Sequence, residues 1–203
     1  NRYNGNDIKS FKLKKNNPNS LFSNTVLRIT GNKKGKVYLL CTDGIAEFDL
    51  TTQRFKTLLQ GNVDAIYYNE KLYIGKREEV FVYNESTGNF DLYYHLAGKD
   101  ITLSCLHLDD KKNLWMGTTG NGVYCLSENK TVSQPITKGN ITSIYEDSSK
   151  ELWIGSWEEG LYHITTDGNI KNLRHDPQNP NSLCSDFVRS CCDCLLYTSD
   201  AAD

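Results

Sequence analysis

Short apolar segments separated by polar turns recur along this chain at nearly constant intervals. Their aromatic positions, 38, 73, 115 and 153, lie 35, 42 and 38 residues apart. A repeat of about 40 residues built from short strands is typical of the blades of a β-propeller. One blade cannot bury both of its own faces, so such a sequence has to repeat. The aligned segments are Val-Tyr-Leu-Leu at 37–40, Leu-Tyr-Ile-Gly at 72–75, Leu-Trp-Met-Gly at 114–117 and Leu-Trp-Ile-Gly at 152–155.

The repeat at 139–174 displays the expected order of strands within one blade. Its second strand is apolar throughout, as expected for a strand that is covered on both faces. Gly155 ends that strand where no side chain fits or where φ is unusual. Asp167-Gly168 predicts a tight hairpin turn before the last strand. The predicted elements are a first strand at 141–145, a polar turn at 146–151, and further strands at 152–155, 161–164 and 170–173.

The chain as a whole is predicted to be all-β. It is expected to form a partial β-propeller of about four complete four-stranded blades with partial blades at both ends. Asn-Pro-Asn-Ser-Leu at 17–21 recurs unchanged at 179–183, so the second copy announces another blade. We therefore expect the chain to begin and end inside blades. The predicted propeller fragment covers 1–193, with a partial blade at 1–15, blades at about 21–60, 61–96, 100–137 and 139–174, and the start of a further blade at 185–193.

Composition and charge exclude several classes of protein. The formal net charge of −2 is too balanced to indicate nucleic-acid binding, and no contact with nucleic acid is expected. No apolar run reaches the length of a membrane-spanning helix. The seven cysteines are odd in number and mostly scattered, which favours small buried thiols. The cluster at 191–194 lacks a second Cys-x-x-Cys or a His pair, so no metal site is predicted.

The residues of the 139–174 repeat resemble a known family. Leu-Trp-Ile-Gly at 152–155, followed by Gly160-Leu161-Tyr162, is similar to the two-component regulator propeller repeat. The segment 175–183 and then Val-Arg-Ser at 188–190 are similar to that family's linker between blades. The resemblance covers residues 1 to about 193. The earlier copies depart from it, because tyrosine replaces tryptophan at Tyr38 and Tyr73 and Leu40 replaces glycine.

The resemblance implies a sensor. It implies a ligand-sensing propeller fragment of a hybrid two-component histidine kinase, located in the periplasm on the outer side of the inner membrane. It further implies an oligosaccharide or another small-molecule ligand, control of glycan-utilisation genes, and a homodimer in the full-length protein. Membrane contact would come only through a segment further downstream. For the fragment itself the resemblance implies no enzymatic activity and no cofactor.

The last ten residues, 194–203, do not continue the repeat. They resemble the translation of a sequencing adapter, and we expect them to be a non-native tail outside the fold. A strand of the Leu-Trp-x-Gly type is expected in their place.

Candidate site residues are few. The four histidines show no His-Glu-x-x-His spacing, and neither a Gly-x-Ser-x-Gly motif nor a phosphate-binding loop is present, so no catalytic residue is predicted. Trp157, next to Glu158, lies between two strands rather than inside an apolar segment, and sugar sites combine an aromatic platform with polar groups. Arg189, on the first strand of the last blade, could face a central channel. The alternative interpretations are that Trp157 packs over a neighbouring blade and that Glu158-Glu159 is a solvated loop.

Two rival functions use the same scaffold. One is a propeller enzyme of the lyase or quinone-dependent dehydrogenase type, because function resides in sites grafted onto a fold. The other is a protein-interaction scaffold. The absence of clustered His, carboxylate or metal-ligand patterns speaks against the enzyme.

Overall fold

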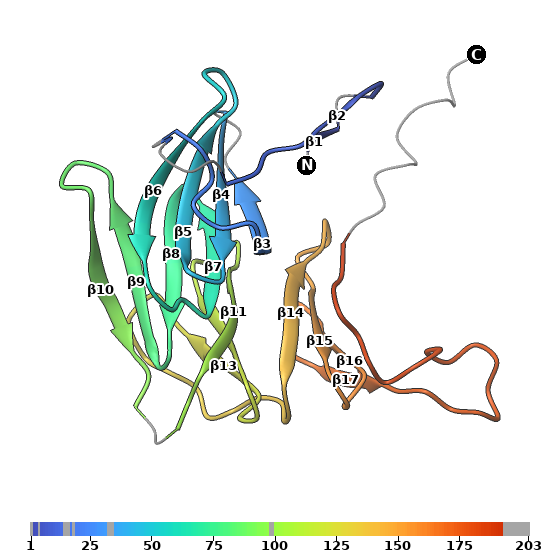
Figure 1. The fold of residues 1–203 in the computed structure, drawn as a ribbon. Helices are drawn as coiled ribbons and strands as arrows, with labels where there is room; N and C mark the ends of the chain where they lie inside the picture. Colours follow the sequence, from blue (N-terminus) through green and yellow to red (C-terminus); the bar gives the residue numbers. More distant parts are fainter. Residues whose placement is uncertain are drawn as a thin grey trace, which may run out of the picture. The chain divides into compact units, whose positions relative to one another are not determined.

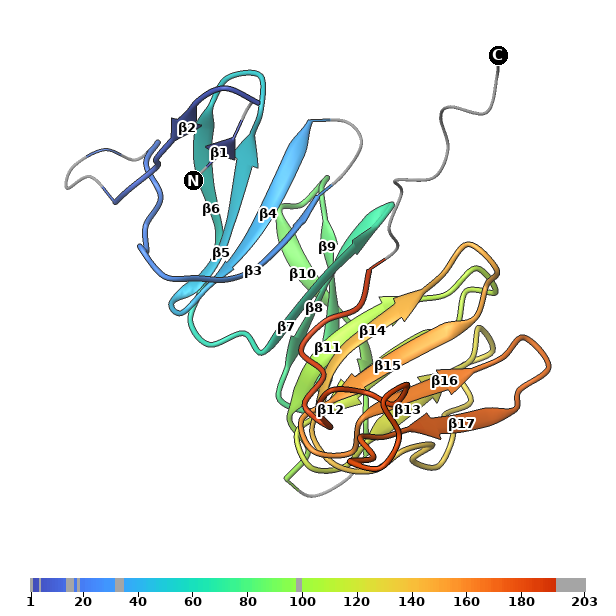
Figure 2. The same ribbon diagram turned by 90° about the vertical axis from the view of Figure 1, so that its right-hand side faces the viewer.

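The computed structural model describes residues 2–3, 5–13, 17, 19–31, 35–97 and 100–192. Throughout these residues the regular structure consists of strands (Figures 1 and 2). The chain divides into two compact units, Asn1–Asp100 and Ile101–Asp203.

The first unit contains two four-stranded antiparallel sheets in which neighbouring strands are also consecutive in sequence. This up-and-down order is the expected topology of a propeller blade. A short hairpin of β1 (Arg2–Tyr3) and β2 (Ile8–Lys9) precedes them. The first sheet comprises β3 (Val26–Gly31), β4 (Lys36–Cys41), β5 (Gly44–Asp49) and β6 (Arg54–Gln60), and the second comprises β7 (Ala65–Asn69), β8 (Lys71–Lys76), β9 (Glu79–Asn84) and β10 (Asn89–His95).

The core of the first unit forms between these two sheets. The apolar residues of β4 and β5 pack against those of β7 and β8, as the apolar second strands predict. A second cluster surrounds Phe48 and Phe55, and Phe11 packs edge-on against both rings at 4.9 and 5.6 Å between centroids. The main core comprises Tyr38, Leu40, Ile45, Val63, Ile66, Leu72, Ile74 and Tyr83.

The second unit contains one three-stranded and one four-stranded sheet with the same up-and-down order. Trp115, Ile141 and Ile154 belong to the core between them. The smaller sheet comprises β11 (Leu103–Leu108), β12 (Leu114–Thr118) and β13 (Val123–Leu126), and the larger comprises β14 (Ile141–Glu146), β15 (Leu152–Ser156), β16 (Leu161–Ile164) and β17 (Ile170–Leu173).

The fold class is confirmed, with one local difference. The repeat at 100–137 was expected to have four strands, and its outer segment forms only a bridge between Leu126 and Val132. Two hydrogen bonds continue the edge, from Ser133 N to Cys125 O and from Ile136 N to Val123 O. Pro135 lies between these donors and has no N–H of its own, which explains why a regular ladder does not form.

The described residues of both Asn-Pro-Asn-Ser-Leu copies make the same two turn hydrogen bonds. Ser20 N donates to Asn17 O, and Ser182 N donates to Asn179 O, each at 3.0 Å. The asparagine side chains also accept a hydrogen bond from the backbone two residues later, as Asx turns do. The repeated sequence therefore makes the same backbone contacts at both places.

The segment after the second copy lies beside the last sheet without forming an assigned strand. Val188 N donates to Ser156 O at 2.9 Å, and Thr142 Oγ1 donates to Val188 O. The start of a further blade at 185–193 stays a prediction, as do the other blade boundaries. The predicted tail at 194–203 lies outside the described residues.

Candidate functional site

The loop between β15 and β16 presents Trp157 at the surface. Trp157 N donates to Asn140 O at 2.9 Å, and Ser156 Oγ accepts a hydrogen bond from Glu159 N at 2.8 Å. These bonds fix the loop backbone, yet the Trp157 side chain stays 54% exposed. Its ring contacts Phe187, itself 42% exposed, with 4.5 Å between centroids and 53° between planes. The two rings form an exposed aromatic pair.

Arg174 borders this aromatic pair and joins three segments of the chain. Its guanidinium contacts Glu159 Oε2 at 2.9 Å and Asp186 Oδ2 at 3.0 Å. It also donates to Glu158 O at 2.9 Å. The bond to Asp186 raises the pKa of Arg174, and the bonds from His175 N and Arg174 lower the pKa of Asp186. Both groups are therefore charged at neutral pH.

We call this set the Trp157 surface. It unites an apolar ring pair with cationic and anionic groups, which is the combination that a sugar ring with one apolar face and several hydroxyls can use. Its members are Trp157, Glu158, Glu159, Arg174, Asp186 and Phe187.

The structure brings together only part of the predicted site. Trp157 and Glu158 are both exposed and adjacent, but Glu158 contributes its carbonyl oxygen while Glu159 supplies the paired carboxylate. Arg189 is also exposed, and among the described residues no hydrogen bond or ion pair joins it to Trp157 or Glu158. Ligand binding by Trp157, Glu158 and Arg189 stays a prediction.

Sequence reasoning missed Arg174, Asp186 and Phe187. Arg174 directly follows β17, and Asp186 and Phe187 belong to the segment that follows the second Asn-Pro-Asn-Ser-Leu copy. Nothing in their local pattern separates them from ordinary loop residues. The second Asn-Pro-Asn-Ser-Leu copy predicted a further blade from 185, and that prediction does not indicate contacts of Asp186 or Phe187 with the loop after β15.

The other two tryptophans lie in the second strands of their repeats, and Trp115 belongs to the core. Trp115 is 8% exposed and donates from Nε1 to Asp109 Oδ2 at 2.8 Å, and Trp153 donates to Asp147 Oδ2 at the same distance. Each aspartate also accepts backbone N–H groups of its own turn. Trp115 is therefore buried and Trp153 half-buried, and both indole N–H groups are paired with an aspartate.

His163 packs against Trp153. Its Nε2 lies 2.7 Å from Glu151 Oε2, and its ring stacks on Trp153 with 4.0 Å between centroids. Within the described part of the chain, no group of three or more His, Cys, Asp or Glu could hold a metal ion. That part also contains no helix long and apolar enough to cross a membrane.

The fold and repeats define this chain as part of a β-propeller, and solved structures share that architecture. The extracellular domain of the hybrid two component system BT3049 from B. thetaiotaomicron has a TM-score of 0.73 and 22% identity, covering 89% of this chain and 26% of that one. The corresponding domain of BT4673 from the same organism has a TM-score of 0.68 and 19% identity, covering 82% and 24%. The chain thus spans about a quarter of either domain.

A propeller enzyme is also similar. Virginiamycin B lyase from Staphylococcus aureus has a TM-score of 0.61 and 15% identity, covering 73% of this chain and 55% of the lyase. A comparison with curated proteins finds no match.

The family model described as "Two component regulator propeller" matches residues 135–158. The resemblance predicted from Leu-Trp-Ile-Gly at 152–155 is confirmed for this segment, which is similar to that family's repeat. The matched segment includes β14, β15 and Trp157.

Proposed function

We propose that this chain is the ligand-sensing propeller part of an extracytoplasmic, periplasmic sensor in a hybrid two-component system. The single observation that carries the proposal is the family repeat at 135–158, which ends at the Trp157 surface. The architecture shared with the BT3049 extracellular domain supports the same class.

We further propose that the Trp157 surface binds an oligosaccharide and that the whole protein controls glycan-utilisation genes. The exposed Trp157 and Phe187 rings offer a platform for the apolar face of a pyranose. Arg174 can donate hydrogen bonds to sugar hydroxyls, while Glu159 and Asp186 can accept them. The ion pairs hold these groups in place before the ligand arrives, which lowers the cost of binding.

Signalling would follow from a shift between two states of a homodimer in the full-length protein. A ligand changes such an equilibrium only if its affinities for the two states differ. The kinase would then respond to the population of one state. The fragment needs no catalytic group for this role.

The second candidate is a propeller enzyme, favoured by the similarity to virginiamycin B lyase. Its natural acid–base pair would be His163 with Glu151. Both side chains are largely buried, and the His163 ring is covered by Trp153. A substrate would have to displace this packing, so the binding role fits the geometry better.

The test is calorimetric titration of the 203-residue chain with oligosaccharides first selected on a glycan array. Trp157→Ala should weaken the selected sugar about tenfold or more, because exposed aromatic anchors carry much of a binding energy. The matched control is Leu92→Ala, since Leu92 is 57% exposed and lies in the other unit. Equal affinity of the Trp157→Ala variant would refute the proposed surface, and turnover of the sugar would favour the enzyme.

A further inference from the structure

The guanidinium of Arg174, at the Trp157 surface, has little hydrogen-bonding capacity left for a ligand. An arginine side chain offers five N–H groups. Nε and Nη2 both donate to Asp186 Oδ2, at 3.3 and 3.0 Å. Nη2 also donates to Glu158 O at 2.9 Å, and Nη1 donates to Glu159 Oε2 at 2.9 Å. These four bonds leave a single N–H, on Nη1.

An anionic group of a ligand therefore finds no clamp at this surface. Arginine grips carboxylates and phosphates through two parallel N–H groups, and one remaining N–H cannot form such a pair. The neighbouring imidazole is engaged as well, because His175 Nδ1 lies 2.6 Å from Leu183 O. The backbone N–H of His175 donates to Asp186 Oδ1 at 2.7 Å, which fixes that carboxylate from its other side.

The charges of the Trp157 surface act in the same direction. One guanidinium stands among three carboxylates, so its members have a formal net charge of −2. The Glu158 side chain is exposed, and among the described residues no hydrogen bond or ion pair engages its carboxylate. A field of this sign repels anionic ligands, while carboxylate oxygens accept hydrogen bonds from hydroxyl groups. The three carboxylates are those of Glu158, Glu159 and Asp186.

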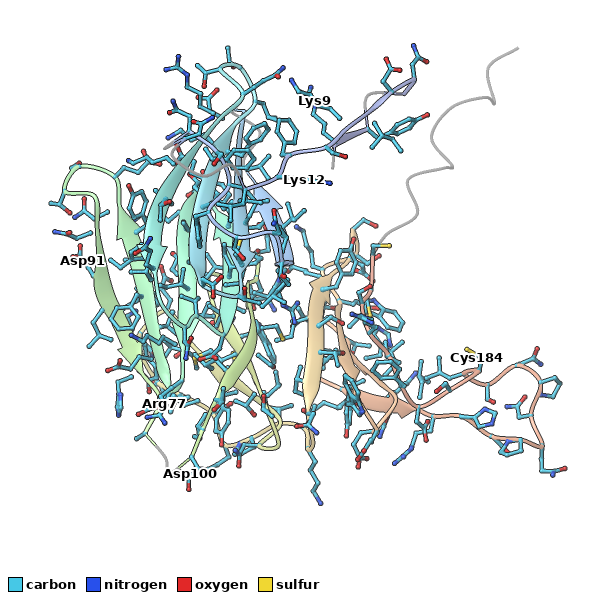
Figure 3. All side chains as sticks on the ribbon, viewed as in Figure 1. Lys9, Lys12, Arg77, Asp91, Asp100 and Cys184 are labelled. Atoms are coloured by element: carbon cyan, nitrogen blue, oxygen red, sulfur yellow. The ribbon has the colours of Figure 1, made fainter. Side chains whose placement is uncertain are left out.

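The aromatic pair is an independent feature that favours an uncharged sugar. The Trp157 and Phe187 rings are exposed, and they provide apolar area without adding charge. Phe187 belongs to the segment that Cys184 marks in Figure 3, and Asp186 comes from the same segment. One segment thus delivers both an apolar ring and a carboxylate that withdraws the guanidinium from ligands.

We propose that Arg174 is a positioning residue whose two ion pairs make the Trp157 surface selective for neutral oligosaccharides over those that carry uronate or sulfate groups. The inference rests on the proposed function, because it specifies the class of sugar that the same surface takes. Arg174 holds Glu159 and Asp186 in place as hydrogen-bond acceptors. In return, these carboxylates keep the guanidinium from binding an acid.

The first experiment applies the 203-residue chain and its Trp157→Ala variant to an array of neutral, uronate-bearing and sulfate-bearing oligosaccharides. Neutral sugars should bind about tenfold or more tightly than acidic ones, and Trp157→Ala should lose them. Acidic sugars bound through Trp157 would overturn the selectivity while the proposed sugar-binding function stands. If no sugar bound, or if binding survived Trp157→Ala, both the proposed surface and this inference would fall.

The second experiment releases the guanidinium. The double variant Glu159→Gln/Asp186→Asn keeps the size of both side chains and removes their charge, so Arg174 becomes available to an acid. Calorimetric titration with tri-galacturonate should show binding about tenfold or more tighter than in the original chain, and added salt should weaken it. The methyl ester of tri-galacturonate, which lacks the charge, should show no such gain. Unchanged binding of tri-galacturonate would contradict the inference, since a merely structural role of the carboxylates creates no affinity for an acid.

Further variants assign the gain to Arg174. Adding Arg174→Gln to the double variant should abolish it, because the cation is then gone. Glu85→Gln/Glu128→Gln is the matched control, since it changes the net charge equally at two exposed residues outside the Trp157 surface, and it should bind tri-galacturonate as the original chain does. A gain in this control, or one that persists without Arg174, would overturn the proposal.

Urea midpoints check that the variants fold, and they should change little because partly exposed ion pairs add little stability. Glu159→Gln alone leaves the bonds of Asp186 intact and should still tighten tri-galacturonate binding about two- to fivefold. No gain in this single variant would likewise count against the inference.

Discussion

The two repeats of the second unit, 100–137 and 139–174, share their inner strands and differ at the outer edge. In each, an aspartate at the end of the first strand accepts the indole N–H of the tryptophan six residues later. In each, the glycine one residue before the end of the second strand, Gly117 or Gly155, lies against the first strand. The outer edge of the 139–174 repeat is the regular strand β17, whereas that of the 100–137 repeat is an interrupted segment around Pro135.

This difference separates the part of a blade that is constrained from the part that is free to vary. The second strands are covered by neighbours on both sides and are largely buried. All four residues of β17 are exposed. An edge that contacts only one neighbouring strand tolerates a proline that would break an inner strand.

The largest loss of stability is expected at Gly122 and Gly160, which lie against the outer segments of their repeats. A Cβ at Gly122 would lie 1.9 Å from Thr137 O and one at Gly160 2.3 Å from Leu173 O, and both residues have φ near +75°. Gly122→Ala and Gly160→Ala should each lower the free energy of unfolding by about 2–4 kcal/mol, from backbone clash and left-handed strain. Urea unfolding followed by tryptophan fluorescence measures this loss of free energy, because all three tryptophans lie in the second unit, Ile101–Asp203.

Gly168 is the matched control for these substitutions. It also has positive φ, at 87°, but a Cβ added there would meet nothing within 4 Å, so Gly168→Ala should cost only about 1 kcal/mol. If Gly122→Ala were as mild as the control, the segment around Pro135 would not act as an outer edge.

A pH dependence distinguishes the first strands of the two repeats. His107 occupies the position opposite Trp115 where the other repeat has Tyr145 opposite Trp153. Burial lowers the pKa of His107 to about 4, although Asp109 opposes the shift and Glu146 Oε2 lies 3.8 Å away. A histidine with a depressed folded pKa stabilises the fold above its unfolded value near 6.5.

Stability should therefore fall as the pH decreases from about 6.5 to about 4, by up to about 3 kcal/mol. Urea midpoints across this range provide the measurement. His107→Gln should flatten the curve within that window. An unchanged slope in the variant would assign the acid sensitivity to other groups.

The smallest difference in stability is expected between substitutions of Asp109 and of Asp147. Asp109 is 6% exposed and Asp147 is half-buried, although both accept an indole N–H. Asp109→Asn should cost about 2 kcal/mol and Asp147→Asn about 1 kcal/mol, because an amide N–H would face a donor and less solvent reaches Asp109. Equal losses in urea unfolding would show that the two turns are energetically alike.

Much of the fold followed from periodicity. Residues 72–75 and 152–155 fall within β8 and β15, and the Asp167-Gly168 turn separates β16 from β17. These features are local, since they depend on alternating side chains and on turn residues. The interrupted outer edge of the 100–137 repeat was also predictable in principle, from Pro135.

The candidate site was only half predictable. Trp157 stood out because an aromatic residue in a polar loop is unusual in this pattern. Its partners Arg174, Asp186 and Phe187 come from distant segments, and their contacts depend on how β17 and the following segment return to β15. No local sequence pattern specifies contacts between segments so far apart in the chain.

By itself, therefore, the sequence determined the repeat, the strand order within it and the class of fold, because each depends on residues within about 40 positions of one another. Only the tertiary structure decided why Gly155 is glycine: its φ lies outside the left-handed region, and a Cβ would lie 2.7 Å from Ser143 Oγ. It also decided which charges meet at the Trp157 surface and that the Tyr38 hydroxyl stays unsatisfied among the described residues. Packing between strands sets these features, and packing combines residues that the linear pattern keeps apart.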